Sequence, residues 1–205
     1  SHPFEVLSKA KGDDRLILGG GRRFETQFGT FIAPNISPDP KAGIGSWSAL
    51  DFVNAVTKGV SPDGAHYYPA FPYTSYRQAK ITDILDLKAY MDTLPPVADP
   101  APENEVGFPF NIRRGLGLWK MLFMDQAPFE DEPSQTPQVN RGAYLVKALG
   151  HCAQCHTPRN LLGAADNTRA LAGAPNPEGK GFIPNITPHP DGIGSWSEQD
   201  IAYAL

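Results

Sequence analysis

The chain has 205 residues, a length that suits one large domain or two small ones. Its 20 glycines and 21 prolines together make up one residue in five, so long loops are expected. A formal net charge of −4, only two cysteines and no apolar run of about 18 residues exclude most nucleic-acid binders, disulfide scaffolds and membrane-spanning chains.

A loop rich in proline and glycine occurs twice in the chain. The sequence PNISPDPKAGIGSWS at 34–48 returns as PNITPHPDGIGSWS at 184–197, with one residue deleted. Each copy runs into a tryptophan, Trp47 or Trp196, and then into a serine with an aspartate three residues later, which is typical of a capped helix start. The repeat predicts two tandem domains, each with a loop, a buried tryptophan and an amphipathic helix.

The two predicted domains are separated by a segment rich in proline and acidic residues. We expect a first domain over 1–95, a linker over 96–137 and a second domain over 138–205. The linker contains an apolar helical stretch at 113–124, in which Met121 and Met124 suit core or interface packing. A helix is also predicted over 140–149, and Gly150 should end it by adopting a positive φ.

The two cysteines of the chain lie in one short motif. They occur in GHCAQCHTP at 150–158, and the pattern C-x-x-C-H is the attachment motif of c-type haem. At this spacing Cys152 and Cys155 can each add to one vinyl group of the haem. His156 can then bind the iron as the proximal ligand.

Three further side chains suit a cofactor in the second domain. Arg159 and Asn160 follow the motif and are suited to hydrogen-bond a haem propionate, because a guanidinium fork matches a carboxylate. Trp196, at the end of the repeated loop, is suited to line the haem pocket. A solvated arginine and a simple core tryptophan are the alternative interpretations.

Two other kinds of site share the C-x-x-C spacing. A redox-active dithiol normally follows a strand in a βαβ pattern, which this sequence does not show. A structural zinc site needs about four ligands, so His151 and His156 would have to join both thiols. Haem attachment is the interpretation that we favour, and both alternatives stay open.

The repeat also predicts where a first haem site would lie. His156 precedes Trp196 by 40 residues, and the corresponding position before Trp47 falls within the first ten residues. His2 is therefore the candidate proximal ligand of a first haem, although Ser1 stands where the second cysteine should be. We expect a chain truncated at both ends, with one haem c evident and two in the full-length protein.

With these residues assembled, the chain resembles the multihaem c-type cytochrome subunits of bacterial membrane-bound alcohol, aldehyde and gluconate dehydrogenases, and their free-standing dihaem relatives. Further shared motifs extend over nearly the whole chain: GGG at 19–21, FGT at 28–30, GVSPDG at 59–64, PAFPYTSY at 69–76, FPFN at 108–111, NRGAYL at 140–145 and CHTPRN at 155–160. The resemblance implies an all-α fold of two tandem cytochrome c-like domains, with short helices and long loops around the haem. It also implies electron transfer in the periplasm, from a dehydrogenase donor to a quinone or oxidase acceptor, with any membrane association made through a partner.

Two departures from the family concern the iron ligands. Phe71 stands where the alcohol dehydrogenase subunits carry the methionine that binds the first haem, so His66 becomes the candidate distal ligand. No methionine follows His156, and the family pattern places the second distal ligand just beyond Leu205. We predict an electron carrier without a nucleic-acid partner. The alternatives are a dihaem peroxidase-like enzyme with an open iron site and a haem-free interaction module.

Overall fold

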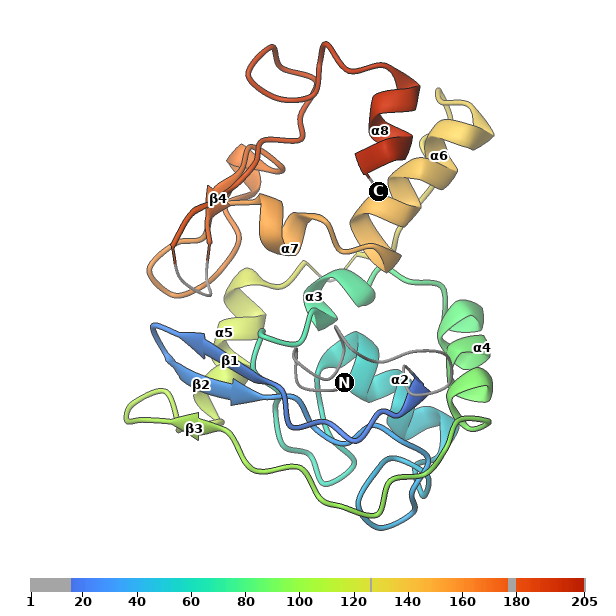
Figure 1. The fold of residues 1–205 in the computed structure, drawn as a ribbon, viewed down its shortest axis with the longest axis vertical. Coiled ribbons are helices and arrows are strands. Elements are labelled where there is room, and N and C mark those ends of the chain that lie inside the picture. Colours follow the sequence, from blue (N-terminus) through green and yellow to red (C-terminus); the bar gives the residue numbers. More distant parts are fainter. Residues whose placement is uncertain (1–15, 126, 177–179, 205) are drawn as a thin grey trace. The chain divides into compact units, whose positions relative to one another are not determined.

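A computed structural model describes residues 16–125, 127–176 and 180–204. The chain divides into two compact units, residues 1–130 and 131–205, and each is described by itself (Figure 1). His2, the candidate ligand of a first haem, lies outside the described residues. No helix in the described part of the chain is long and apolar enough to cross a membrane.

Unit 1 contains a small antiparallel sheet of three strands in the order β1-β2-β3. β1 (Arg23–Thr26) and β2 (Gly29–Ile32) form a hairpin, and β3 (Glu105–Val106) pairs with β2. Arg23 and Glu105 join the two outer strands through an ion pair of 2.6 Å between Nη2 and Oε2. The sheet therefore includes a piece of the range that was predicted as a linker.

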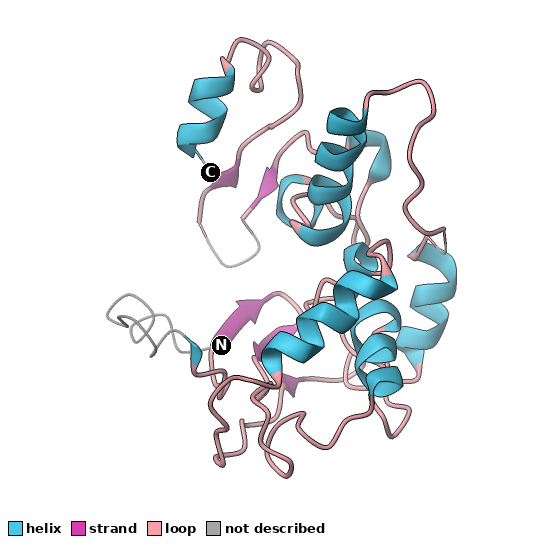
Figure 2. Ribbon diagram, turned by 90° about the vertical axis from the view of Figure 1, so that its right-hand side faces the viewer, coloured by secondary structure: helices cyan, strands magenta, loops and turns pink. Residues whose placement is uncertain are grey.

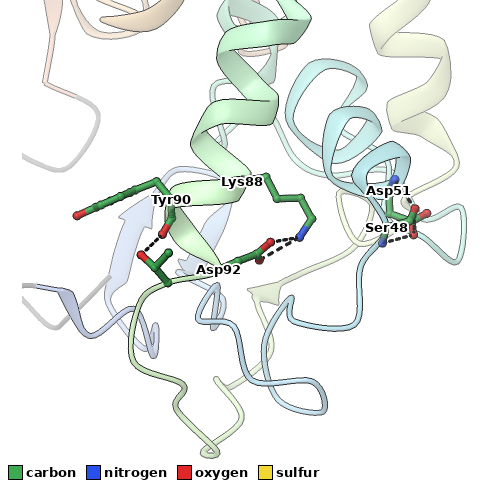
Figure 3. A network of polar contacts seen from close by, with 6 residues as sticks. Ser48, Asp51, Lys88, Tyr90 and Asp92 are labelled. Carbon is green, nitrogen blue, oxygen red and sulfur yellow. Dashed lines mark hydrogen bonds and ion pairs between the residues drawn. The ribbon is translucent and has the colours of Figure 1, made fainter.

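α2 (Ala49–Lys58) is the central helix of unit 1, since α3 (Tyr73–Tyr76) and α4 (Ile81–Met91) both pack against it. A capping box begins α2 at Ser48, as predicted (Figure 3), and Gly59 ends it with a φ of 59°. The buried side chains around these helices are mainly apolar: Phe31, Ile32, Ile44, Phe52, Ala55, Val56, Tyr73, Ile84, Met91 and Leu94. This core is what holds unit 1 together.

α5 (Gly115–Phe123) lies within the predicted linker and packs against the rest of unit 1 through Lys120. Lys120 is only 7% exposed, whereas Leu118 and Met121 are 56% and 73% exposed. Met124, directly after the helix, is buried as expected for a packing methionine, but Met121 is exposed in unit 1. The one fully buried residue of α5 is thus a lysine, whose ammonium group contacts other parts of unit 1.

Unit 2 consists of short elements joined by loops (Figure 2). In chain order they are α6 (Pro137–Tyr144), the π-helical turn η2 (Leu145–Leu149), α7 (Ala153–His156), the 3₁₀ turn η3 (Asn167–Arg169), β4 (Ala174–Pro175), β5 (Phe182–Ile183) and α8 (Glu198–Ala204). The expected helical class is confirmed, because helices make up most of the regular structure in both units. The short strands were not predicted, since pairs of two to four residues leave no clear alternation in the sequence.

The helix predicted over 140–149 ends differently from our expectation. α6 gives way to η2, in which the amide of Gly150 donates to Leu145 O at 2.6 Å. Gly150 has an ordinary φ of −77°, and His151 adopts the positive φ of 43°. Gly150 therefore follows the last helical residue as predicted, but the positive φ expected of it falls on His151, because the wider π turn shifts the reversal of the chain by one residue.

The repeated loop has the same hydrogen bonds in both units. Asn35 Oδ1 accepts from the Ser37 amide at 2.9 Å, and Asn185 Oδ1 accepts from the Thr187 amide at 2.8 Å. The amide of each tryptophan donates to the carbonyl three residues earlier at 3.0 Å. The sequence repeat is therefore confirmed as a repeat of local structure. Trp196 is 46% exposed and Trp47 is partly exposed, so the prediction of a buried tryptophan is wrong for unit 2 and holds only in part for unit 1.

Candidate haem attachment site

Cys152 and Cys155 stand on one short helical turn. α7 begins just after His151, whose positive φ turns the chain out of η2. The amides of Cys155 and His156 both donate to Cys152 O, at 3.2 and 3.0 Å. Both thiols are free, with Cys155 exposed and Cys152 partly exposed. The turn thus groups two thiols and an imidazole as covalent haem attachment requires.

The imidazole of His156 is oriented by the second copy of the repeated loop. Its Nδ1 atom lies 2.8 Å from Pro184 O. Since a carbonyl oxygen only accepts hydrogen bonds, Nδ1 carries a proton, and in the neutral imidazole Nε2 then has the lone pair. The carbonyl of His156 in turn accepts from the Gly173 amide at 2.8 Å. The chain therefore fixes both the tautomer and the backbone of a candidate metal ligand.

Two residues of this site were not predicted from the sequence. Pro184 is the first residue of the second copy of the loop. Gly173, which has a φ of 86°, lies two residues after Leu171, and Leu171 O accepts a hydrogen bond of 3.0 Å from the Ile186 amide in that loop. In unit 1, Leu18 and Gly20 are arranged in the same way, with a hydrogen bond of 3.0 Å and a φ of 81°. The shared pattern L-x-G before each loop is the signal that could have found them.

Arg159 and Asn160 stabilise the chain that follows the motif. Arg159 Nη2 donates to the backbone O and to Oε1 of Gln154, at 2.9 and 2.8 Å, and its Nη1 donates to Gly163 O at 2.7 Å. Asn160 Oδ1 accepts from the amides two and four residues later, at 2.9 and 3.1 Å. These contacts lie within the protein, and the predicted contacts with a haem propionate stay a prediction.

Unit 2 buries few large side chains among the residues that the structure describes. Its buried residues are Asn140, Tyr144, Ala148, Thr157, Pro158, Gly163, Ala164, Gly173 and Ala174. Several large apolar side chains are exposed instead: Val139, Leu145, Leu161, Leu162, Phe182, Trp196 and Tyr203. A porphyrin ring presents a broad apolar surface, so the two thiols, the imidazole and this apolar surface fit haem c.

The two alternatives to haem find no support in the described ranges. No group of three or more histidine, cysteine, aspartate or glutamate side chains in them could hold a metal ion, as a zinc site would need. The element before α7 is the π turn η2 and not a strand, so the setting of a redox-active dithiol is also missing there.

His66, the candidate distal ligand of a first haem, lies in unit 1 beside a buried lysine. Lys120 Nζ is 3.1 Å from His66 Nδ1 and donates to the carbonyls of Lys58 and Gly59 at 2.7 and 2.6 Å. Burial lowers the pKa of Lys120 to about 8, and burial with the nearby ammonium group lowers the pKa of His66. With Lys120 charged, His66 Nδ1 accepts and Nε2 carries the proton. Iron binding by His66 stays a prediction.

The chain is similar to several curated cytochromes, although no known protein-family profile matches it. It is 53% identical over 197 residues to the "Diheme cytochrome c-type" of Cereibacter sphaeroides, which covers 96% of this chain and 65% of that protein. It is 40% identical over 193 residues to the fructose dehydrogenase cytochrome subunit of Gluconobacter japonicus, covering 93% and 39%. It is 37% identical over 195 residues to the cytochrome c subunit of the quinone alcohol dehydrogenase of Gluconobacter oxydans, covering 91% and 41%. The chain thus spans only part of the length of these relatives.

Proposed function

The chain belongs to the multihaem c-type cytochrome family, and from this premise we propose that unit 2 carries electrons through haem c attached to Cys152 and Cys155. The observation that carries the proposal is the hydrogen bond from His156 Nδ1 to Pro184 O, which leaves Nε2 of the neutral imidazole as the nitrogen able to bind a metal. Haem supplies an iron that exchanges one electron between its ferrous and ferric states. The remaining chemistry belongs to the chain.

The chain contributes tethering, orientation and tuning. Thioethers at Cys152 and Cys155 would keep the cofactor bound in both oxidation states. The carbonyl of Pro184 polarises the imidazole of His156 through Nδ1–H, which raises the basicity of Nε2 and favours the ferric state. No catalytic residue is needed for this reaction, since the protein only positions the cofactor and sets its potential.

The donor and the acceptor are inferred from the relatives. Because the names of the fructose and alcohol dehydrogenase relatives describe cytochrome subunits of dehydrogenases, we infer that a dehydrogenase is the donor. A quinone or an oxidase of the respiratory chain is the acceptor that we propose. Location in the periplasm and peripheral membrane association through a partner belong to the same proposal.

A second haem in the full-length protein is part of the proposal. The loop that contacts His156 in unit 2 has a counterpart in unit 1, where Leu18 O accepts from Ile36 as Leu171 O accepts from Ile186, and Gly20 has a positive φ like Gly173. His2 lies 16 residues before Leu18, and His156 lies 15 residues before Leu171. This agreement supports His2 as the proximal ligand of a first haem and supports two cytochrome c-like domains over 1–95 and 138–205.

The test is a spectroscopic redox titration of the full-length protein, produced in a host that matures c-type cytochromes. We expect a reversible haem couple, and we expect the Cys152→Ala/Cys155→Ala variant to lose the haem of unit 2 only. A protein without a reversible couple would contradict the proposal. Fast turnover of peroxide by the intact protein would favour the peroxidase-like alternative instead.

A further inference from the structure

α7 is too short to be stable without contacts from outside. It has four residues, well under the length at which an isolated helix persists in water. Each of its carbonyls lies in the last turn of the helix, where partners within the helix are missing. Two of these carbonyls find partners elsewhere in unit 2: His156 O accepts from the Gly173 amide, and Gln154 O accepts from Arg159.

The side chain of Arg159 forms hydrogen bonds both with α7 and with the turn that follows it. Its Nη2 atom reaches the backbone O and Oε1 of Gln154, the residue that directly precedes Cys155. Its Nη1 atom reaches Gly163 O, at 2.7 Å, in the turn that follows. Three N–H bonds of the guanidinium are thus directed at oxygens of the protein, a fork that lysine cannot reproduce.

The turn beyond α7 is itself well held, which makes it a firm anchor. The amide of Asn160 donates to Ala164 O, and the amide of Gly163 donates to Asn160 O, each at 2.9 Å. Arg159 and Ala165 face each other in an antiparallel bridge. The guanidinium therefore ties a short, intrinsically unstable helix to a hydrogen-bonded turn. A cation at the C-terminal end of a helix is also favoured by the helix dipole.

We propose that Arg159 is a positioning residue that holds α7, and with it Cys155 and His156, in the orientation used for haem. This inference rests on the proposed function, because it assigns to Arg159 a contact with the attachment turn and not with a haem propionate. Arg159 acts through the carbonyl and the amide oxygen of Gln154, which accept its hydrogen bonds, while its charge also lies close enough to the Cys155 thiol to interact with it electrostatically.

The experiment compares Arg159→Met and Arg159→Lys with Arg169→Met in the full-length haem-loaded protein. Arg169→Met is the matched control, because it removes the same charge from an exposed arginine of the same unit. Hydrogen exchange at the amides of Cys155 and His156 is measured by NMR. The hyperfine-shifted ring signals of His156 in the oxidised protein, which a general loss of stability does not move, form the second readout.

We expect exchange at these two amides to become about tenfold faster in both Arg159 variants, because a charge-assisted pair of hydrogen bonds is lost. The ring signals of His156 should shift in both variants, and Arg169→Met should change neither readout. Wild-type exchange rates in Arg159→Lys, with a changed redox potential in Arg159→Met, would overturn the inference in favour of a charge effect on the haem. A wild-type protein that binds no haem would instead contradict the proposed function, while the exchange comparison at α7 still decides the role of Arg159.

Discussion

The two copies of the repeated loop have the same backbone hydrogen bonds but different surroundings. Ile44 donates to Ser37 O at 2.9 Å in unit 1, and Ile193 donates to Thr187 O at 3.0 Å in unit 2. Ile44 is only 4% exposed, and the helix that follows, α2, buries four residues. In unit 2, α8 buries none of the residues that the structure describes. Local sequence thus sets the shape of the loop, and the rest of each unit decides what it buries.

The difference shows how each unit is stabilised. In unit 1 the loop is anchored from outside, because Asn35 Nδ2 donates to Val97 O and Asp99 O at 2.7 and 3.0 Å. The contacts of Asn185 run to Thr187 within its own loop. Among the described residues unit 2 also buries fewer large side chains than unit 1, and we propose that haem supplies apolar contact to unit 2.

Removal of the attachment site is the change with the largest expected effect on this comparison. In the Cys152→Ala/Cys155→Ala variant, we expect amide exchange at Tyr144 and Ala148 to accelerate at least about a hundredfold, because unit 2 loses a large part of its core. Exchange at Ile84 in unit 1 should be unchanged. NMR of the full-length protein measures all three sites. A unit 2 that keeps its protection would show that it is stable without haem.

Gly20 and Gly173 occupy equivalent places in the two units, and substitution by alanine should lower the free energy of unfolding equally at both. A Cβ atom at Gly20 would lie 2.5 Å from Ala33 O, and one at Gly173 would lie 2.8 Å from Ile183 O, with positive φ at both. We expect Gly20→Ala and Gly173→Ala to lower the free energy of unfolding by about 2–3 kcal/mol each. Thermal unfolding of the haem-loaded protein measures the loss.

Neighbouring glycines provide the controls for these two substitutions. Gly21 and Gly181 also have positive φ, but a Cβ atom at either would meet nothing within 4 Å. Gly21→Ala and Gly181→Ala should lower the free energy of unfolding by only about 1 kcal/mol, from backbone strain alone. Equal losses at crowded and open positions would show that the close approach in each L-x-G turn is unimportant.

The two loop asparagines should respond differently, in line with their surroundings. Asn35→Ala removes a buried amide and leaves two carbonyls without their donor, so we expect a loss of about 2 kcal/mol. Asn185→Ala removes contacts within a partly exposed loop, so we expect a loss of about 0.5 kcal/mol. Urea unfolding of both variants gives the two values. Equal losses would contradict the difference in anchoring between the units.

The smallest expected effect is a dependence of the free energy of unfolding of unit 1 on pH. Burial lowers the pKa of Lys120 from 10.5 to about 8, so between these values the unfolded chain binds more protons than the folded one. The free energy of unfolding of unit 1 should therefore rise by about 1 kcal/mol between pH 8 and about pH 9.5. Lys120→Met should abolish this rise. Urea unfolding at both pH values measures it, and the same slope in both proteins would exclude Lys120 as its source.

The sequence predicted the features that depend on nearby residues. The capping box at Ser48, the repeat of the loop and the C-x-x-C-H turn all involve contacts within a few residues, so their patterns are readable. It missed the features that depend on distant residues. Lys120 is buried because its ammonium finds carbonyls 61 and 62 positions away, and His156 is oriented by a carbonyl 28 positions away.

Two other predictions, on the backbone of Gly150 and on the burial of Trp196, failed although the local motif was identified correctly. Gly150 was expected to reverse the chain, but the π turn transferred the positive φ to His151. Trp196 was expected to line the haem pocket, with a core tryptophan as the alternative; it is 46% exposed in unit 2, which is wrong for a core tryptophan, and its contact with haem stays a prediction. In both cases the local motif was recognised and its surroundings were not, because those surroundings are set by packing.

The proposed electron transfer depends most directly on whether haem is attached in unit 2. Mass spectrometry of the peptide that contains Cys152 and Cys155, from full-length protein matured alongside an established c-type cytochrome, tests this claim. We predict that the peptide carries the mass of one haem, with both thiols converted to thioethers. Unmodified thiols at both positions, in cells where the control cytochrome is fully loaded, would contradict the account.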